Sequence, residues 1–168
     1  MGGTAPKELL PPDWEVILSA VAENEIVRLG ETFGKTVRFT LQDIAAFAAA
    51  CQDSNPLHRD EAEAGQSRFG EVIASGPHTA SMMMGLAASH FSRRDDGVKR
   101  QMVCLNFNFA YKAPVYADED ITLHWVVSSA EWNRKLEGYV VLVDGAASTQ
   151  RSGVAVVGRG TLLVKEVA

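Results

Sequence analysis

The sequence contains little cysteine and no paired cysteine motif. Its 168 residues include two cysteines, Cys51 and Cys104, which form no Cys-x-x-Cys pair and no disulfide framework. Both stand among apolar or alternating residues, so we expect them to be buried free thiols in a reducing compartment. A small fold held together by disulfides is thereby excluded.

Positive charge is also scarce. Lys and Arg number 16 against 21 Asp and Glu, which gives a formal net charge of −5 at pH 7. A protein that binds nucleic acid carries a basic footprint, so nucleic acid is not an expected partner. The balance still leaves room for a small basic patch that contacts a phosphorylated ligand.

Long apolar runs are missing as well. No segment approaches the ~18–20 apolar residues of a membrane-spanning helix. The N-terminus lacks the apolar stretch of a signal peptide, and Pro6 stands where a myristoylation motif has Ser or Thr. We therefore expect a cytoplasmic protein without a membrane partner.

Length and composition fit one globular domain. A chain of 168 residues, 46% hydrophobic and 22% charged, is long enough to bury roughly 70% of its unfolded surface without a metal or disulfide. Prolines at positions 6, 11 and 12 are typical of a loosely held arm, which we expect over residues 1–24. The domain then covers residues 25–168.

The chain before residue 60 predicts a strand followed by a helix. Residues 25–30 and 35–39 are typical of a strand that is interrupted near two glycines. Thr40 and Asp43 have the spacing of a capping box, and the helix should stop before Asn55-Pro56, because the residue preceding proline avoids the α region. The apolar stripe of this helix is Ile44, Phe47, Ala48 and Cys51.

The segment from Pro77 to Ser92 predicts the longest helix. Proline suits a first helical position, and the residues that follow are apolar or small on every side. Such a helix, about 24 Å long, is expected to be buried rather than half exposed. Between the two helices, residues 57–70 predict a loop with at most one turn near Asp60.

The C-terminal half changes to the period of a strand. Residues 103–112 and 121–127 alternate between large apolar and smaller or polar side chains, and residues 139–143 and 154–157 are rich in valine. One buried helix followed by strands at hairpin spacing is an α+β pattern with an antiparallel sheet. Turns are predicted at Pro114, Asp118, Asn133 and Asp144-Gly145.

The segment Asp53-Ser54-Asn55-Pro56-Leu57-His58 holds the densest cluster of side chains suited to acid–base catalysis. A turn through Pro56 would bring the carboxylate of Asp53 and the imidazole of His58 to one water molecule, which the pair could activate as general acid and base. The spacing alone leaves a second interpretation open, in which Asp53 and Asn55 only make turn hydrogen bonds and His58 lies at the surface.

The same residues resemble the signature of the MaoC-like, (R)-specific enoyl-CoA hydratase family. The similarity runs from Phe47 to His58, continues through Phe69-Gly70 and Gly76, and returns in the segment Tyr111 to Ile121. It implies a single hot-dog domain, with an antiparallel sheet wrapped around the long helix. It also implies a homodimer or a dimer-based assembly, because hot-dog subunits pair so that their sheets become continuous.

The resemblance also assigns roles to residues. Asp53 and His58 correspond to the catalytic pair that activates the water added to a trans-2-enoyl-CoA, giving an (R)-3-hydroxyacyl-CoA. Gly76 corresponds to the glycine whose backbone N–H binds the thioester oxygen, and Ser81 and Asn55 join it as substrate-binding positions. A free N–H at the start of a helix suits that task, because its partial positive charge faces the developing enolate.

Two positions depart from the family pattern. The family usually has glycine directly before the catalytic aspartate and histidine directly before the oxyanion glycine, where this chain has Gln52 and Ser75. His78, near the oxyanion position, is more consistent with a structural hydrogen bond than with catalysis. The methionine triplet at residues 82–84 is more consistent with adaptable filling of the core. Arg93 and Arg94 with Lys99 and Arg100 are expected at a solvated helix end.

No metal or redox cofactor is expected, since no pair of His, Cys, Asp or Glu has the spacing of a ligand motif. Three rival functions stay open: a hot-dog acyl-CoA thioesterase, a dehydratase acting on an acyl carrier protein or on a branched or short dicarboxylyl thioester, and a non-catalytic subunit that binds acyl thioesters. The presence of both Asp53 and His58 favours hydration over the thioesterase and over the non-catalytic subunit.

Overall fold

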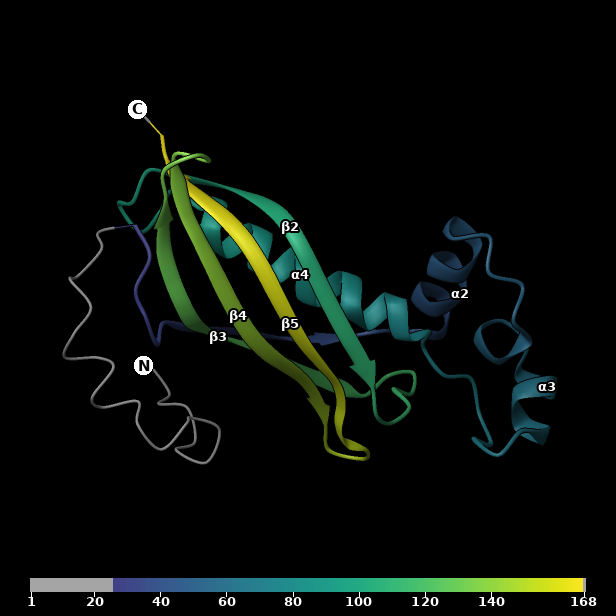
Figure 1. Ribbon diagram of the computed structural model, residues 1–168. Coiled ribbons are helices and arrows are strands. Elements are labelled where there is room, and N and C mark those ends of the chain that lie inside the picture. Colours follow the sequence, from purple (N-terminus) through teal and green to yellow (C-terminus); the bar gives the residue numbers. More distant parts are fainter. Residues whose placement is uncertain (1–25, 168) are drawn as a thin grey trace.

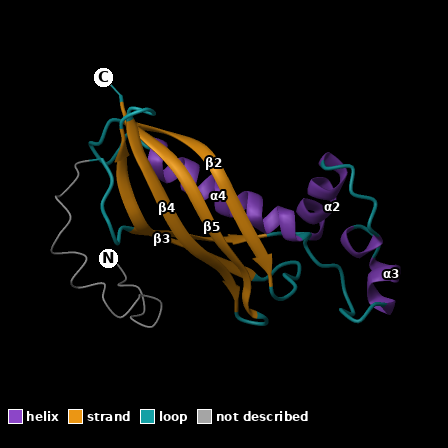
Figure 2. Cartoon of the chain, viewed as in Figure 1, coloured by secondary structure: helices purple, strands orange, loops and turns teal. Residues whose placement is uncertain are grey.

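The computed structural model describes residues 26–167, so the predicted N-terminal arm lies outside the described part. Figure 2 shows one extended sheet, one long helix against it and short helices beyond it. In chain order the elements are β1 (Thr32–Arg38), α2 (Leu41–Ala50), the 3₁₀ turn η2 (Pro56–His58), α3 (Glu61–Gln66), α4 (Gly76–Ser92), β2 (Arg100–Tyr111), β3 (Asp120–Asn133), β4 (Gly138–Thr149) and β5 (Gly153–Glu166).

The five strands form one antiparallel sheet in the order β1-β3-β4-β5-β2, and α4 lies against one face of it (Figure 1). Alternate residues of β3, including Leu123 and Trp125, are fully buried beneath the helix. The indole N–H of Trp125 donates to the carbonyl of Met83 in α4 at 2.9 Å, which ties the sheet to the helix. The predicted α+β class and hot-dog fold are confirmed.

Glycines on the inner face of the sheet make room for aromatic rings. Gly145 pairs directly with Trp125, and a Cβ at position 145 would overlap the indole ring. The turn predicted at Asp144-Gly145 is therefore wrong, because this glycine serves close packing inside β4. The turn lies instead at residues 150–152, and β5 runs much further than the predicted residues 154–157.

The first strand also differs from the prediction. Residues 26–28 lie outside any strand, and residues 29–30 form a turn that ends at Gly30, which has φ of 75°. β1 then runs from Thr32 without interruption at Gly34, whose missing side chain lets the backbone carbonyl of Leu123 approach: a Cβ there would lie 2.8 Å from that oxygen. This glycine allows a close strand contact rather than breaking the strand.

Exposure corrects two further expectations. Cys51 and Cys104 are free but exposed, because Cys51 caps the end of α2 and Cys104 lies on β2 at the edge of the sheet. The long helix α4 matches its predicted range but is not buried all round. Its covered side includes Met83 and Ala87, whereas Met84 and Gly85 are exposed in the single chain. No helix of the described residues is long and apolar enough to cross a membrane.

A buried ion network replaces the solvated helix end predicted near Arg100. The side chain of Arg100 is only 3% exposed and lies 2.9 Å from the carboxylate of Asp96 and 3.8 Å from that of Glu31. Glu31 in turn lies 2.8 Å from His90 in the last turn of α4. The network fastens the C-terminal end of α4 to the chain before β1, because a buried guanidinium needs charged partners.

We expect this network to make stability sensitive to acid. The hydrogen bond from Arg93, followed by the backbone N–H of Val98, lowers the pKa of Asp96 from 3.8 to about 2. A depressed folded-state pKa gives stability that is complete above the unfolded value of 3.8 and is lost as pH falls through about 2. Urea midpoints at pH 6, 4 and 3 should therefore fall less for Asp96→Asn than for the wild type. An equal fall in both proteins would contradict the assignment.

Candidate active site

The carboxylate of Asp53 is carried by the C-terminal end of α2. The predicted capping box starts this helix: Asp43 N–H donates to the Thr40 hydroxyl at 3.1 Å, and the Asp43 carboxylate accepts from Thr40 N–H at 2.9 Å. At the other end, Asp53 N–H donates to the carbonyl of Ala48 at 2.8 Å. The helix therefore fixes where the Asp53 side chain leaves the backbone.

Gln52 has a backbone conformation that favours glycine. Its φ is 58°, in the left-handed region, and this is the position where the resembling family has glycine. The positive φ allows the chain to turn out of α2 and deliver Asp53. The residue is exposed, so its side chain adds strain without filling the core.

Gln52→Gly is expected to raise the free energy of unfolding by about 0.5–1 kcal/mol, because relief of left-handed strain exceeds the added chain entropy of glycine. Urea unfolding measures the change. Gln42→Gly, in the regular first turn of α2, is the matched control and should lower stability by about 1 kcal/mol. A loss of stability in Gln52→Gly as large as in the control would contradict the argument.

The residues between Asp53 and His58 form a turn with two local hydrogen bonds. The Asp53 carboxylate accepts from Asn55 N–H at 2.9 Å, and the Asn55 side-chain oxygen accepts from Leu57 N–H at 3.1 Å, capping η2. The turn hydrogen bonds of the second interpretation thus exist, but they do not leave His58 at the surface. They orient the chain so that His58 is buried, with 8% of the residue exposed.

His58 is anchored through one nitrogen. Its Nδ1 lies 2.7 Å from the carbonyl oxygen of Ile73, and Ile73 N–H donates to the carbonyl of Leu57 at 3.1 Å. A carbonyl oxygen only accepts, so Nδ1 carries a proton, and in the neutral form of the ring Nε2 is an acceptor. Nε2 lies 3.8 Å from Oδ2 of Asp53.

The separation of the Asp53 and His58 side chains suits a water molecule between them. Two acceptors cannot hydrogen-bond to each other, and 3.8 Å exceeds the usual hydrogen-bond distance. A water molecule has two protons to donate, one to each acceptor. The arrangement of Asp53 and His58 thus suits holding and deprotonating one water. Among the residues 26–167, no group of three or more potential metal ligands is found.

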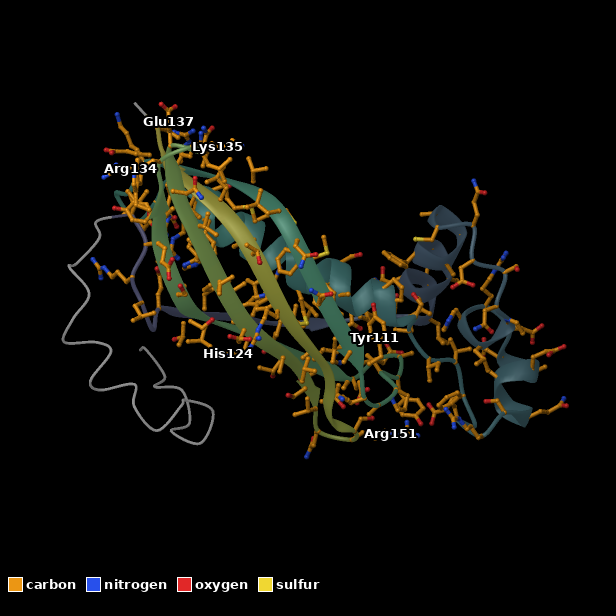
Figure 3. The ribbon with its side chains drawn as sticks, in the orientation of Figure 1. Tyr111, His124, Arg134, Lys135, Glu137 and Arg151 are labelled. Carbon is orange, nitrogen blue, oxygen red and sulfur yellow. The ribbon has the colours of Figure 1, made fainter. Side chains whose placement is uncertain are left out.

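Gly76 begins α4 and has its N–H free of a protein acceptor among the described residues. The next residue, Pro77, has no N–H, so the first amide of the helix is the donor that faces outward at this end. A Cβ at Gly76 would lie 2.6 Å from the ring of Tyr111, which Figure 3 shows at the end of β2 beside α4. Only glycine fits beneath that ring.

His58 and Gly76 line the same cavity of about 300 Å³. Its walls are mainly apolar, and Thr79, one turn beyond Gly76, faces it together with Val156 of β5. Sequence reasoning missed these residues, since a register between distant strands and α4 brings them together. The remaining lining residues are Arg68, Phe69, Ile73, Ala74, Pro77, Tyr111, Lys112, Ala113, Pro114 and Val115.

Three of the predicted site residues stand apart from this cavity. Asp53 is half-buried and borders His58 rather than the cavity wall, and the side chain of Asn55 is occupied in capping η2. Ser81 is exposed on another side of α4. Ser75, which replaces the family histidine, is buried as the N-cap of α4 and makes no capping hydrogen bond.

Comparison with known proteins shows the family to which the chain belongs. The family model described as "MaoC like domain" matches residues 25–146. The chain is 25% identical over 136 residues to an (R)-specific enoyl-CoA hydratase of Aeromonas caviae, covering 81% of this chain and 94% of the relative. It is 27% identical over 103 residues to a mitochondrial 3-hydroxyacyl-[acyl-carrier-protein] dehydratase of Arabidopsis thaliana, covering 61% of this chain and 57% of that protein.

The fold comparison gives the same result. The solved structure of the (R)-hydratase from A. caviae superposes with a TM-score of 0.72 at 25% identity, over 86% of this chain and all of that one. A MaoC-like dehydratase from Rhodospirillum rubrum gives a TM-score of 0.70 at 22% identity, over 84% and 95% of the two chains. Since the family model covers most of its length, this chain belongs to the MaoC-like dehydratase family.

Proposed function

We propose that this protein catalyses the reversible hydration of a trans-2-enoyl-CoA to an (R)-3-hydroxyacyl-CoA. The observation that carries the proposal is the 3.8 Å gap between Nε2 of His58 and Oδ2 of Asp53, two acceptors beside a cavity that also contains the Gly76 end of α4. The named relatives, a hydratase and a dehydratase, support the same reaction class.

In the proposed reaction the water held by Asp53 and His58 attacks C3 of the enoyl group. Its oxygen forms the new C–O bond while one of its protons passes to the Asp53/His58 pair. The electrons of the double bond move to the thioester carbonyl, which becomes an enolate. The pair then returns the proton to C2, so one water is added overall and no redox cofactor is needed. Acid–base catalysis of this kind contributes typically ~10²–10⁴ in rate.

The N–H of Gly76 stabilises the enolate oxygen. The amide stands at the positive end of α4 and has no acceptor among the described residues. A donor aimed at charge that appears only in the transition state lowers the barrier more than it strengthens substrate binding. The lining also contains Arg68 and Lys112 but no acidic residue, which suits a substrate whose carrier bears phosphate groups.

The test is an assay with crotonyl-CoA in which two signals are followed together. Loss of absorbance at the enoyl-thioester band reports hydration, and a thiol reagent reports cleavage of the thioester. We expect hydration without thiol release. Thiol release instead would support the thioesterase, and inactivity with enoyl groups from C4 upward on both CoA and acyl carrier protein would support the binding subunit.

We further propose that the protein forms a homodimer through β2. This strand is the edge of the sheet, and its side chains of Val103 and Leu105 are 56% and 47% exposed. A long apolar edge is a template for pairing with another strand. The cytoplasmic location expected from the sequence stays a prediction.

Light scattering coupled to size exclusion should give twice the chain mass for the wild type. Leu105→Lys is expected to shift the population toward monomer, since it places a charge on the pairing edge. Val154→Lys, at an exposed position next to the turn between β4 and β5, is the matched control and should stay dimeric. A wild-type monomer at all accessible concentrations would refute the dimer.

A further inference from the structure

His78 is a buried titratable residue that no step of the proposed reaction uses. It lies in the first turn of α4, two residues after Gly76, and is 7% exposed. Its side chain does not line the cavity. The ring lies instead between Phe39, at a centroid distance of 3.9 Å and an interplanar angle of 13°, and Phe47, at 4.4 Å and 6°. We call this arrangement the three-ring stack.

The three-ring stack joins α2 to α4. Phe39 directly precedes the N-cap of α2, Phe47 lies on α2, and His78 comes from α4. In Figure 1 α2 lies beyond the end of the sheet, beside the N-terminal end of α4. Because the imidazole has a ring on each face, the stack restricts both the separation of the two helices and the sliding of one past the other.

The position of α2 determines the position of the Asp53 carboxylate. Asp53 N–H donates to Ala48 at 2.8 Å and Gln52 N–H donates to Ala49 at 3.0 Å, so Asp53 moves with the end of the helix. His58 is held separately, through its bond to Ile73. The gap between Asp53 and His58 therefore changes whenever α2 shifts against the rest of the domain.

Hydrogen bonding does not explain why a histidine occupies position 78. Its Nδ1 is buried and has no partner among the described residues. Burial lowers the pKa of His78, and the nearby carboxylate of Asp43 opposes this only in part, so the ring is neutral at neutral pH. A neutral ring with an unpartnered nitrogen contributes through its flat shape, and the missing hydrogen bond is a cost to stability.

We infer that His78 is a positioning residue: its ring, held between Phe39 and Phe47, keeps the Asp53 carboxylate in place relative to His58 and the Gly76 amide. The inference rests on the proposed function for its effect on rate, but the mechanical coupling between α2 and α4 stands without it. It also predicts that a flat apolar ring can replace the imidazole.

Three variants test the inference: His78→Ala, which empties the space between the rings, His78→Phe, which keeps a flat ring, and His124→Phe as the matched control. His124 is half-buried on β3, away from α2 (Figure 3), and its pKa is likewise lowered by burial. We expect His78→Ala to lower kcat about 10–100-fold with KM changed less than about threefold, because small misplacements of reacting groups cost rate. His78→Phe should keep kcat within about threefold of the wild type and raise the melting temperature.

Hydrogen exchange followed by mass spectrometry gives a readout that is independent of the reaction. Peptides covering residues 41–53 should exchange faster in His78→Ala than in the wild type, while peptides from β4 and β5 stay unchanged. His78→Phe and His124→Phe should both exchange like the wild type over residues 41–53. Unchanged exchange in His78→Ala would overturn the inference.

The kinetic outcomes separate a positioning role from a catalytic one. If His78→Phe loses as much kcat as His78→Ala, the nitrogen is required and the inference is wrong. If the wild type hydrates no enoyl thioester, the proposed function fails, and the exchange measurement alone then decides whether His78 holds α2 in place.

Discussion

Asp53→Asn should lower kcat for hydration by at least two orders of magnitude while leaving the fold intact. An amide has nearly the shape of a carboxylate and one side-chain oxygen still accepts from Asn55 N–H, so the turn to His58 survives. The amide cannot take a proton from water, however, and the pair loses its negative charge. KM should change little, because Asp53 does not line the cavity.

His58→Ala should cause a loss of similar size for a different reason. It removes the Nε2 acceptor and also leaves the carbonyl of Ile73 without its partner, so a loss of stability accompanies the loss of rate. The proposed mechanism has the two residues act on one water, so it predicts that the double variant loses scarcely more rate than either single variant.

The control for the carboxylate is Asp95→Asn, an exposed position at the opposite end of α4. It changes the net charge by the same amount and should leave kcat and KM unaltered. Steady-state rates with crotonyl-CoA, alongside circular dichroism of each variant, measure these effects. Full activity in Asp53→Asn would remove the basis of the proposed hydration mechanism.

Local signals in the sequence indicated that Asp53 and His58 could lie close together, whereas the packing of distant segments could not be predicted from them. The capping box at Thr40 and Asp43 and the proline turn before His58 involve residues within a few positions of each other, so their spacing specifies their geometry. The family resemblance supplied the proposed catalytic roles of Asp53, His58 and Gly76. No local pattern indicates that Ile73, fifteen positions after His58, accepts the bond that fixes its tautomer.

Burial was the property that the sequence predicted worst. Arg100 follows a charged segment and suggested a solvated helix end, yet it is buried, with Asp96 four residues before it and Glu31 from the chain before β1 as its charged partners. Cys104 stands among apolar neighbours, yet it is exposed because β2 is an edge strand. Gly145 suggested a turn, yet it is needed beneath Trp125. Each error depends at least in part on how segments far apart in the sequence are arranged in the fold.

Gly76→Ala is the second change with a large expected effect. A Cβ at this position would lie 2.6 Å from the Tyr111 ring, closer than real side-chain carbons approach each other, so either the ring or the start of α4 must move. Displacement of the amide would weaken the proposed bond to the enolate oxygen. Loss of one such donor typically costs about 10²–10³ in kcat, and we expect a loss of that order with a smaller change in KM.

The matched control lies on the same helix. Gly85 has no heavy atom within 4 Å of the place where a Cβ would stand, and it is exposed in the single chain. Gly85→Ala should therefore keep activity and raise stability by about 0.5–1 kcal/mol, as alanine does in a helix interior.

Tyr111 distinguishes a clash from a general intolerance of alanine at position 76. Tyr111→Ala removes the ring that the new methyl group would strike, so the double variant Gly76→Ala/Tyr111→Ala should be more active than Gly76→Ala alone. Recovery in that double variant would mean that the ring at the end of β2 is what requires glycine at the start of α4. If the decreases in kcat of the two single variants simply add, the ring did not displace the amide. The contact with Tyr111 would then no longer support the proposed bond from Gly76 N–H to the thioester oxygen.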